Sequence, residues 1–234
     1  MTEAELESIS DVAYRAIRED IIFARLKPGE RLRLEPIRRK YGVSVTTLRE
    51  ILNRLTSEGF VTAEGQRGFE VAAVSDADLE ELAGLRVLLE GHALRQSFAM
   101  GDLDWEARVV AAQHKLHVLE QRMMADDESV RTAWKRADWE FHRALIQACG
   151  SRQLLQVHGA VFDKYLRYQM LTLTFRGEIA AKEHRQMMEA ALARDADTAC
   201  EVLARHIRGG VEHSLGARAA ETQRVASIKL HNVG

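Results

Sequence analysis

The sequence YGVSVTTLREILNRL (residues 41–55) has the pattern of a tight turn that leads directly into a helix. Gly42 is a residue type that is common in the turn between two packed helices. Ser44 can cap the next helix, because its hydroxyl can accept a hydrogen bond from a backbone N–H of the first turn. The apolar residues at helical spacing are Leu48, Ile51, Leu52 and Leu55. We therefore expect a helix over residues 45–58 that turns this face toward a small core.

The surrounding sequence completes a small domain over residues 8–74. Residues 8–26 show apolar side chains at helical spacing, and Pro36 suits the first turn of a second, short helix. Two short apolar stretches flank the glycine-containing residues 65–68 and predict a hairpin: Phe60–Thr62 and Phe69–Val71. The order helix, helix, turn, helix, hairpin is that of a winged helix-turn-helix domain.

The distribution of charge indicates that this domain binds DNA. The whole chain has a net charge of −2, but residues 25–54 hold nine basic and three acidic residues, a local charge of +6. In a helix-turn-helix domain the helix after the turn enters the major groove with its N-terminal residues. The residues expected to contact DNA are Arg38, Ser44, Thr46, Thr47, Arg49 and Arg67. The alternatives are a solvated helical face and a small helical domain that binds protein.

Three segments of this domain resemble a known family. LKPGERL (residues 26–32), YGVSVTTLREILNRL (residues 41–55) and EGFV (residues 58–61) look like the DNA-binding domain of GntR-type bacterial repressors. The resemblance implies binding to double-stranded operator DNA. Val45 stands where the family usually has a DNA-contacting arginine, and Thr47 stands where it often has proline. The operator therefore need not match the one that is usual for the family.

The composition excludes several classes of protein. Hydrophobic residues make up 46% of the 234 residues and only two are proline, which favours a packed helical protein over a disordered chain. No apolar run approaches the ~18–20 residues that cross a bilayer, and the acidic start MTEAELESIS is unlike a secretory leader. Cys149 and Cys200 are too few for a disulfide framework. We expect a soluble cytoplasmic protein.

Residues 75–216 predict a second, all-helical domain. The expected helices cover residues 77–100, 104–125, 128–149, 152–173, 179–194 and 196–215. The expected N-caps are Asp102, Asp127, Ser151 and Asp195. Residues 217–234 lose the helical period and are expected to form a frayed tail. The predicted fold is therefore mainly α, with a winged helix-turn-helix domain in residues 1–74 followed by a bundle of six or seven helices.

The stretch ADWEFH (residues 137–142) places two polar groups on an apolar helix face. Asp138 and His142 are one turn apart and point the same way, in line with large apolar side chains. A buried charge is costly unless it has a partner. His184 and His206 hold the same kind of position on two later helices. One Asp and three His that meet inside a helical bundle have the chemistry of a metal site.

The alignment of four such groups is what favours a metal, because a single histidine on an apolar face is more often structural. We expect one divalent ion per chain; zinc is the first choice, and nickel and manganese also accept these ligands. The remaining histidines lack this alignment and are expected at the surface or on helix flanks: His92, His114, His117, His158 and His213.

These residues also carry a second resemblance. Asp-x-x-x-His at residues 138–142, Glu183-His184 and the segment ARHI (residues 204–207) look like the ligand-sensing domain of the FadR subfamily, among the members that contain a metal. The resemblance implies that one ion is held by Asp138, His142, His184 and His206. It also implies a small carboxylate effector that binds at the open coordination positions.

Arg86 lies on the apolar stripe of the first helix of this second domain. A buried guanidinium needs a carboxylate partner, which is either Glu90 or a bound organic acid. In the resembling family a comparable arginine helps to hold the effector acid. Arg167 and Tyr168 are expected to line the same cavity, so we predict Arg86, Arg167 and Tyr168 as the effector-binding residues.

These features predict a one-component transcriptional regulator and not an enzyme. It would bind a pseudo-palindromic operator as a homodimer and act as a repressor that a small organic acid releases. A metal-dependent hydrolase is one alternative, because an ion with open coordination positions can activate water. The other alternative is a purely structural metal in a bundle that serves dimerisation alone.

Overall fold

The computed structural model describes residues 8–64, 68–172 and 175–231, with side chains described as far as residue 220. The chain divides into two compact units. The first comprises Met1–Ser75 with Leu166–Leu171, and the second comprises Asp76–Tyr165 with Thr172–Gly234. Within the described residues, no helix combines the length and hydropathy needed to cross a membrane.

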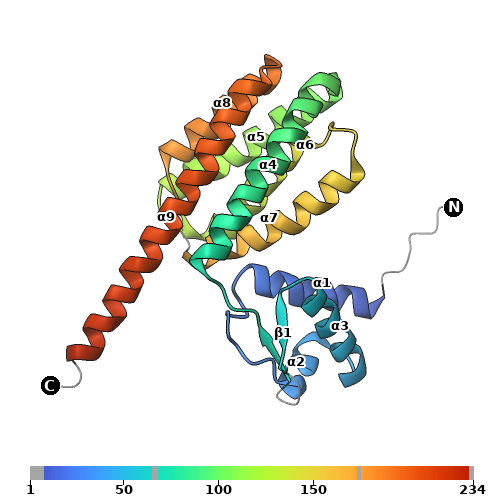
Figure 1. Cartoon of the computed structure of the whole chain (residues 1–234), viewed down its shortest axis with the longest axis vertical. Helices are drawn as coiled ribbons and strands as arrows, with labels where there is room; N and C mark the ends of the chain where they lie inside the picture. Colours follow the sequence, from blue (N-terminus) through green and yellow to red (C-terminus); the bar gives the residue numbers. More distant parts are fainter. Residues whose placement is uncertain (1–7, 65–67, 173–174, 232–234) are drawn as a thin grey trace. The chain divides into compact units, whose positions relative to one another are not determined.

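The first unit is a winged helix-turn-helix domain. Its elements are α1 (Ile9–Ile22), α2 (Leu34–Tyr41), α3 (Val45–Ser57), β1 (Val61–Ala63) and β2 (Phe69–Val71) (Figure 1). Gly42 ends α2 in a left-handed conformation with φ of 68°, which glycine adopts without strain. The Ser44 hydroxyl caps α3 by accepting from the backbone N–H of Thr47 at 3.1 Å. The strands are antiparallel, with Val61 opposite Val71.

The core of the first unit forms where the apolar faces of its helices meet. Leu48 and Leu52 are fully buried, as expected for the inner face of α3. Asp20 interrupts the apolar face of α1 and is itself buried. Its carboxylate accepts hydrogen bonds from Lys40 Nζ at 2.7 Å and from the Tyr41 hydroxyl at 2.5 Å, so the buried charge is compensated.

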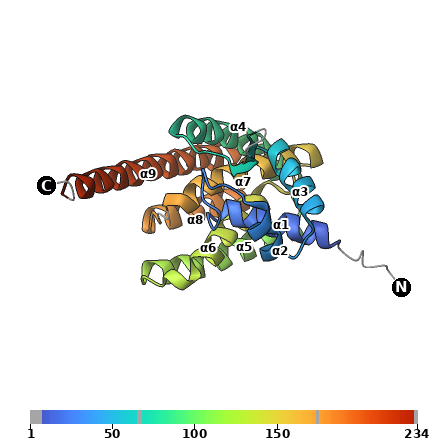
Figure 2. The same ribbon diagram turned by 90° about the horizontal axis from the view of Figure 1, so that it is seen from below.

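The second unit is built from helices, and the predicted mainly α fold is confirmed. Its elements are α4 (Asp76–Met100), α5 (Leu103–Met124), a 3₁₀ turn (Glu128–Val130), α6 (Arg131–Ile146), α7 (Arg152–Thr172), α8 (Glu178–Leu192) and α9 (Ala196–His231). Residues 166–171 of α7 belong to the first unit. Figures 1 and 2 show α4 lying along α9, while α5 packs against α6 and α8. Asp102 and Asp195 accept backbone hydrogen bonds at the starts of α5 and α9, as expected.

The helix bounds differ from the prediction by three residues or more in four places, one of which is the end of α6 at Ile146 and not at residue 149. The first helix ends at Ile22 and not at residue 26, because Ala24 adopts a left-handed conformation. The helix expected from residue 128 begins with the 3₁₀ turn, in which Asp127 accepts from the N–H of Ser129, and α6 starts at residue 131. Helix α9 continues to residue 231, so most of the expected tail extends the last helix.

Candidate metal centre

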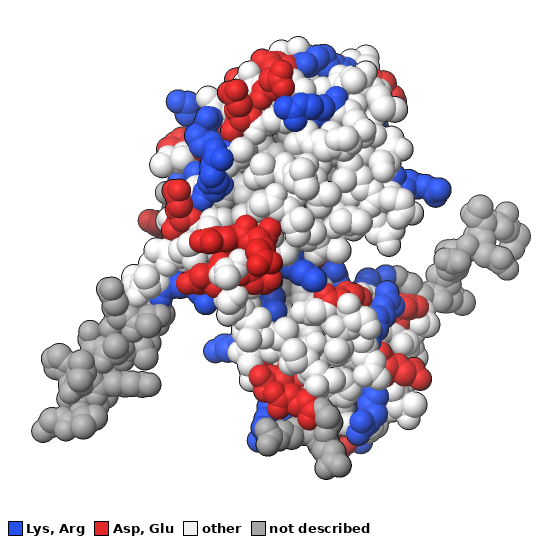
Figure 3. Space-filling model, viewed as in Figure 1, with Lys and Arg blue, Asp and Glu red and all other residues white. Residues whose placement is uncertain are grey.

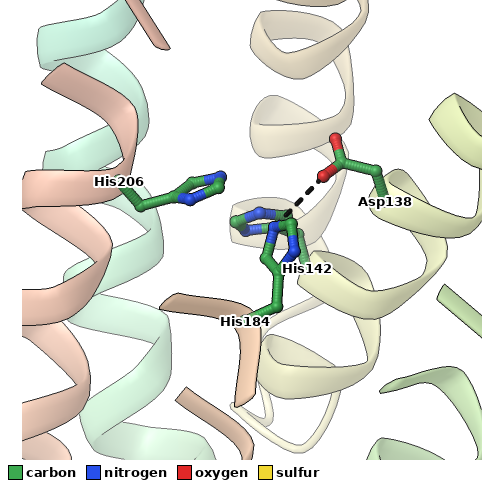
Figure 4. Close-up of side chains that lie close together, drawn as sticks. All are labelled: Asp138, His142, His184 and His206. Carbon is green, nitrogen blue, oxygen red and sulfur yellow. Dashed lines mark ion pairs between the residues drawn. The ribbon is translucent and has the colours of Figure 1, made fainter. Parts of the chain in front are cut away.

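The four predicted ligands lie together inside the second unit and form what we call the four-residue cluster. Asp138 and His142 project from α6, His184 from α8 and His206 from α9 (Figure 4). One ligand atom from each residue lies within 4.8 Å of all the others. The exposed fractions of these residues are 4%, 1%, 1% and 9%. The cluster therefore has the donor set and the compactness of a single metal site.

Each histidine of the cluster is oriented by a glutamate. The pairs, joined from Nδ1 to a carboxylate oxygen, are His142–Glu90 at 2.9 Å, His184–Glu120 at 2.6 Å and His206–Glu183 at 2.9 Å. Such a glutamate fixes the ring orientation and leaves Nε2 as the metal-binding atom. Nε2 of His142 is buried and makes no hydrogen bond with any described residue, while Nε2 of His184 faces Asp138 Oδ1 at 3.3 Å. These residues therefore fit a bound cation.

Burial and hydrogen bonding have opposite effects on the pKa values of the three rings. Burial lowers the pKa of His142 below its usual value and holds the pKa of His206 well below it. Burial also opposes the charged form of His184, but its contacts with the carboxylates of Asp138 and Glu120 outweigh burial and raise its pKa to about 9. Without metal at pH 7, His184 is therefore protonated and the other two rings are neutral.

We predict that metal binding releases about one proton at pH 7, because the ion must displace the proton of His184. The neutral ring binds the metal, so the apparent affinity should rise about tenfold per pH unit up to pH about 9 and then level off. Titration calorimetry with zinc in two buffers of different ionisation enthalpy measures the number of protons. An affinity that does not change between pH 7 and pH 8 would contradict the prediction.

Glu90 connects the cluster to a buried arginine and a further histidine. Arg86 Nε donates to Glu90 Oε1 at 2.6 Å, and both residues are almost completely buried. Nε2 of His158 lies 3.1 Å from the same oxygen. Burial alone would raise the pKa of Glu90, but the positive charge of Arg86 and the hydrogen bond with His142 hold it well below its usual range. Glu90 is thus the acidic centre of this network.

The structure places the predicted effector residues in different surroundings. Arg86 has Glu90 as its carboxylate partner, and its NH2 group lies 3.5 Å from Nδ1 of His142. Arg167 donates to the backbone carbonyl of Ala72. The Tyr168 hydroxyl accepts from the backbone N–H of Ser75 at 3.2 Å. Only Arg86 is thereby placed beside the four-residue cluster, and the effector roles of all three remain predictions.

Sequence reasoning missed several residues that support the cluster. Glu120 and Glu183 were not expected to be buried, although Glu120 lies one turn after the buried Leu116 on the inner stripe of α5. Lys135, with Nζ 3.5 Å from Asp138 Oδ2, lies one turn before that ligand on α6. The common signal is a charged residue in register with buried apolar ones.

The expectation for His158 was wrong. This ring is 1% exposed and belongs to the network around Glu90, because it lies one helical turn before the buried Phe162 on the inner face of α7. His117 is half-buried. The other three histidines outside the cluster are exposed, as expected: His92, His114 and His213.

The residues expected to contact DNA lie around the start of α3. Thr46 and Arg49 are exposed there, and Val45 is 38% exposed. The Ser44 hydroxyl is 2.9 Å from that of Thr47, so these two groups partly satisfy each other. The Arg38 side chain, on α2, donates to Glu35. Arg67 lies outside the described residues.

Comparison with known families decides the class of the protein. The family of bacterial regulatory proteins named gntR matches residues 9–71, and the FCD domain matches residues 81–209. The chain belongs to the GntR family. It is a DNA-binding transcriptional regulator with an FCD domain, so the predicted family is confirmed and the enzyme alternative is set aside.

Relatives of this GntR regulator match along most of its length. The HTH-type transcriptional regulator BphR of Paraburkholderia xenovorans is 37% identical over 210 residues, which cover 89% of this chain and 86% of BphR. The repressor GlaR of Escherichia coli is 32% identical over 202 residues, which cover 83% of this chain and 90% of GlaR. Among solved structures, E. coli McbR/YncC has a TM-score of 0.76 at 18% identity, covering 90% and 99% of the two chains, and so shares the fold.

Proposed function

We propose that this GntR regulator is a cytoplasmic repressor whose FCD domain holds one divalent metal ion and a small carboxylate effector. The observation that carries the proposal is the convergence of three histidines and Asp138 within 4.8 Å, with a glutamate on Nδ1 of each ring. Buried histidines that were only structural would not need three separate carboxylates to direct their Nε2 atoms to one point.

Four protein ligands leave coordination positions open on a six-coordinate ion. Three imidazoles and one carboxylate suit zinc, nickel and manganese, and we take zinc as the first candidate. When bound, the ion would supply a Lewis acid to which a carboxylate can coordinate. The protein's own residues orient the ligand atoms and exclude water from the centre.

Arg86 supports a carboxylate as the effector. Its guanidinium is buried beside His142 and is paired with Glu90, so it supplies positive charge next to the cluster. A guanidinium has five N–H donors, more than one carboxylate uses, and can therefore serve Glu90 and an effector together. Arg167 and Tyr168 are retained as proposed effector residues.

A homodimer is part of this proposal, because two recognition helices are needed to read the two halves of a palindromic operator. Figure 3 shows a broad area of the second unit without basic or acidic side chains. Helix α4 exposes two large apolar side chains, Leu85 at 44% and Leu88 at 67%. Exposed apolar residues of this kind support coverage by a second copy.

The effector would act by binding one conformation of the dimer more tightly than the other. The effector then changes operator affinity by the same factor by which operator DNA changes effector affinity. GlaR is named a repressor, which supports release of the operator by the acid as the direction of control.

The proposal is tested with the metal-loaded full-length protein and DNA fragments from the region upstream of its own gene. Operator affinity is measured by fluorescence anisotropy with and without a panel of dicarboxylates, hydroxy acids and sugar acids. At least one acid should weaken operator binding, by about 5–150-fold. A metal-bound protein that binds operator and responds to none of these acids would favour the structural-metal alternative.

We predict that Arg49→Ala weakens operator binding. Arg49 is exposed on the N-terminal half of α3, the part of a recognition helix that reads base edges. Loss of one arginine contact should cost about 1–3 kcal/mol, measured by anisotropy with the same DNA. Arg185→Ala, which removes an exposed charge from α8, is the control. If both variants bind the operator with equal affinity, Arg49 does not read the DNA sequence. The metal content should be unchanged in each variant.

A further inference from the structure

A hollow of about 370 Å³ opens between α6 and α7. None of the four cluster residues lines it. The seven residues that do are Trp139, Arg143, Arg152, Leu155, Gln156, His158 and Gly159. The proposed function makes no use of this hollow.

The charged side chains around the hollow are both basic. Arg143 comes from α6 and Arg152 from the start of α7, and none of the seven lining residues is acidic. Among the carboxylates of the described residues, none forms an ion pair with either guanidinium. Two guanidinium groups without acidic partners attract an anion, and arginine holds a carboxylate through paired N–H donors.

The remaining wall is suited to an organic body. Leu155 and Trp139 supply apolar surface. Trp139 is fixed in place, since its ring stacks on His158 at 5.4 Å between centroids and packs on Phe162 at 4.3 Å. His158 is buried, and its Nε2 lies 3.1 Å from Glu90 Oε1, so a side chain with a partner in the interior forms the floor of the hollow.

Gly159 is the glycine that lines this hollow. It lies inside α7, where glycine is less favourable than alanine. A Cβ atom at this position would meet no other atom within 4 Å, so packing against the protein does not explain the glycine. A larger side chain there would occupy the hollow that Gly159 lines.

The geometry points to a second ligand site of the FCD domain in this hollow, for a small organic carboxylate with an apolar body. The carboxylate lies between Arg143 and Arg152, and the apolar body lies on Leu155 and Trp139. This site does not depend on a metal ion, because its lining contains none of the four cluster residues.

Benzoate is the probe, and the full-length protein is first stripped of metal with a chelator, so that the acid cannot bind through an ion. Calorimetry and tryptophan fluorescence measure the affinity. The double variant R143Q/R152Q should bind benzoate at least about tenfold more weakly than the wild type does. The wild type should likewise bind the neutral analogue benzamide at least about tenfold more weakly than benzoate. Loss of the fluorescence change in Trp139→Phe would assign the signal to the hollow.

Gly159→Leu fills the hollow and should abolish benzoate binding while the helical circular dichroism stays unchanged. Gly216→Leu is the matched control, because a Cβ at this α9 glycine also meets no atom within 4 Å, and it should bind benzoate like the wild type. The inference is overturned if the wild type binds no benzoate up to about 10 mM, or if R143Q/R152Q or a folded Gly159→Leu binds it with wild-type affinity.

Discussion

Replacement of His184 by alanine is expected to remove the metal ion from the purified protein. Nε2 of His184 faces Asp138 at the centre of the four-residue cluster, and Nδ1 is held by Glu120. Loss of an outer hydrogen bond to a ligand costs 10–100-fold in metal affinity in known sites, so loss of the ligand itself should cost more than about 100-fold. The response of operator binding to the effector should disappear with the metal.

The measurement is the metal content per chain by plasma mass spectrometry, combined with operator affinity in the presence and absence of acid. Alanine also leaves Glu120 buried without its hydrogen-bond partner, which destabilises the fold. His184→Gln keeps a hydrogen-bond donor at this position and removes the imidazole, so it separates metal binding from folding. His114→Ala, on the exposed face of α5, is the control and should keep its metal. A folded His184→Gln protein with one ion per chain would contradict the ligand assignment.

The positions of the four cluster residues could be predicted because helical period fixes the direction of a side chain. Asp138 and His142 are four residues apart, and His184 and His206 each lie in register with buried apolar residues. What the period does not give is the pairing between helices. Helix α5 supplies Glu120 to a histidine of α8, and such a contact depends on packing between segments that are distant in the sequence.

The burial of charged and titratable residues was the feature that the sequence predicted least well. The sequence alone favours the surface for a glutamate or a histidine, since burial of a charge is costly without a partner. Glu183 and His158 are buried because partners from other helices compensate them: His206 for the first and Glu90 for the second. The winged helix-turn-helix domain was easier to predict, because local signals such as the Ser44 cap and the Gly42 turn define it.

Replacement of Glu90 by alanine is expected to destabilise the protein by about 3–5 kcal/mol, which is the usual cost of removing one partner from a buried ion pair. Arg86 would keep its charge in a site where it is 2% exposed, without the carboxylate that now lies 2.6 Å from its Nε atom. His142 and His158 would lose the same partner. The free energy of unfolding is measured by denaturant titration of the metal-free protein, so that metal loss does not contribute.

Two comparisons show whether the unpaired arginine causes this loss. Glu81→Ala removes an exposed glutamate from the same helix and should change the stability by less than about 0.5 kcal/mol. The double variant R86M/E90L removes both charges and should be more stable than Glu90→Ala, because no buried charge is left without a partner. A double variant that is less stable than Glu90→Ala would show that packing, and not charge, accounts for the loss.

The effect of Glu90→Ala should also depend on pH, with a sign that follows from the lowered pKa of the Glu90 carboxyl. A carboxylate whose pKa is lower in the folded protein than in the unfolded chain contributes its full stability above the unfolded value of about 4.3, and this contribution declines as the pH falls below it. The difference between wild type and Glu90→Ala should therefore be largest near neutral pH and shrink in acid. A difference that grows below pH about 4 would mean that Glu90 is neutral in the folded protein and that Arg86 is not held by its charge.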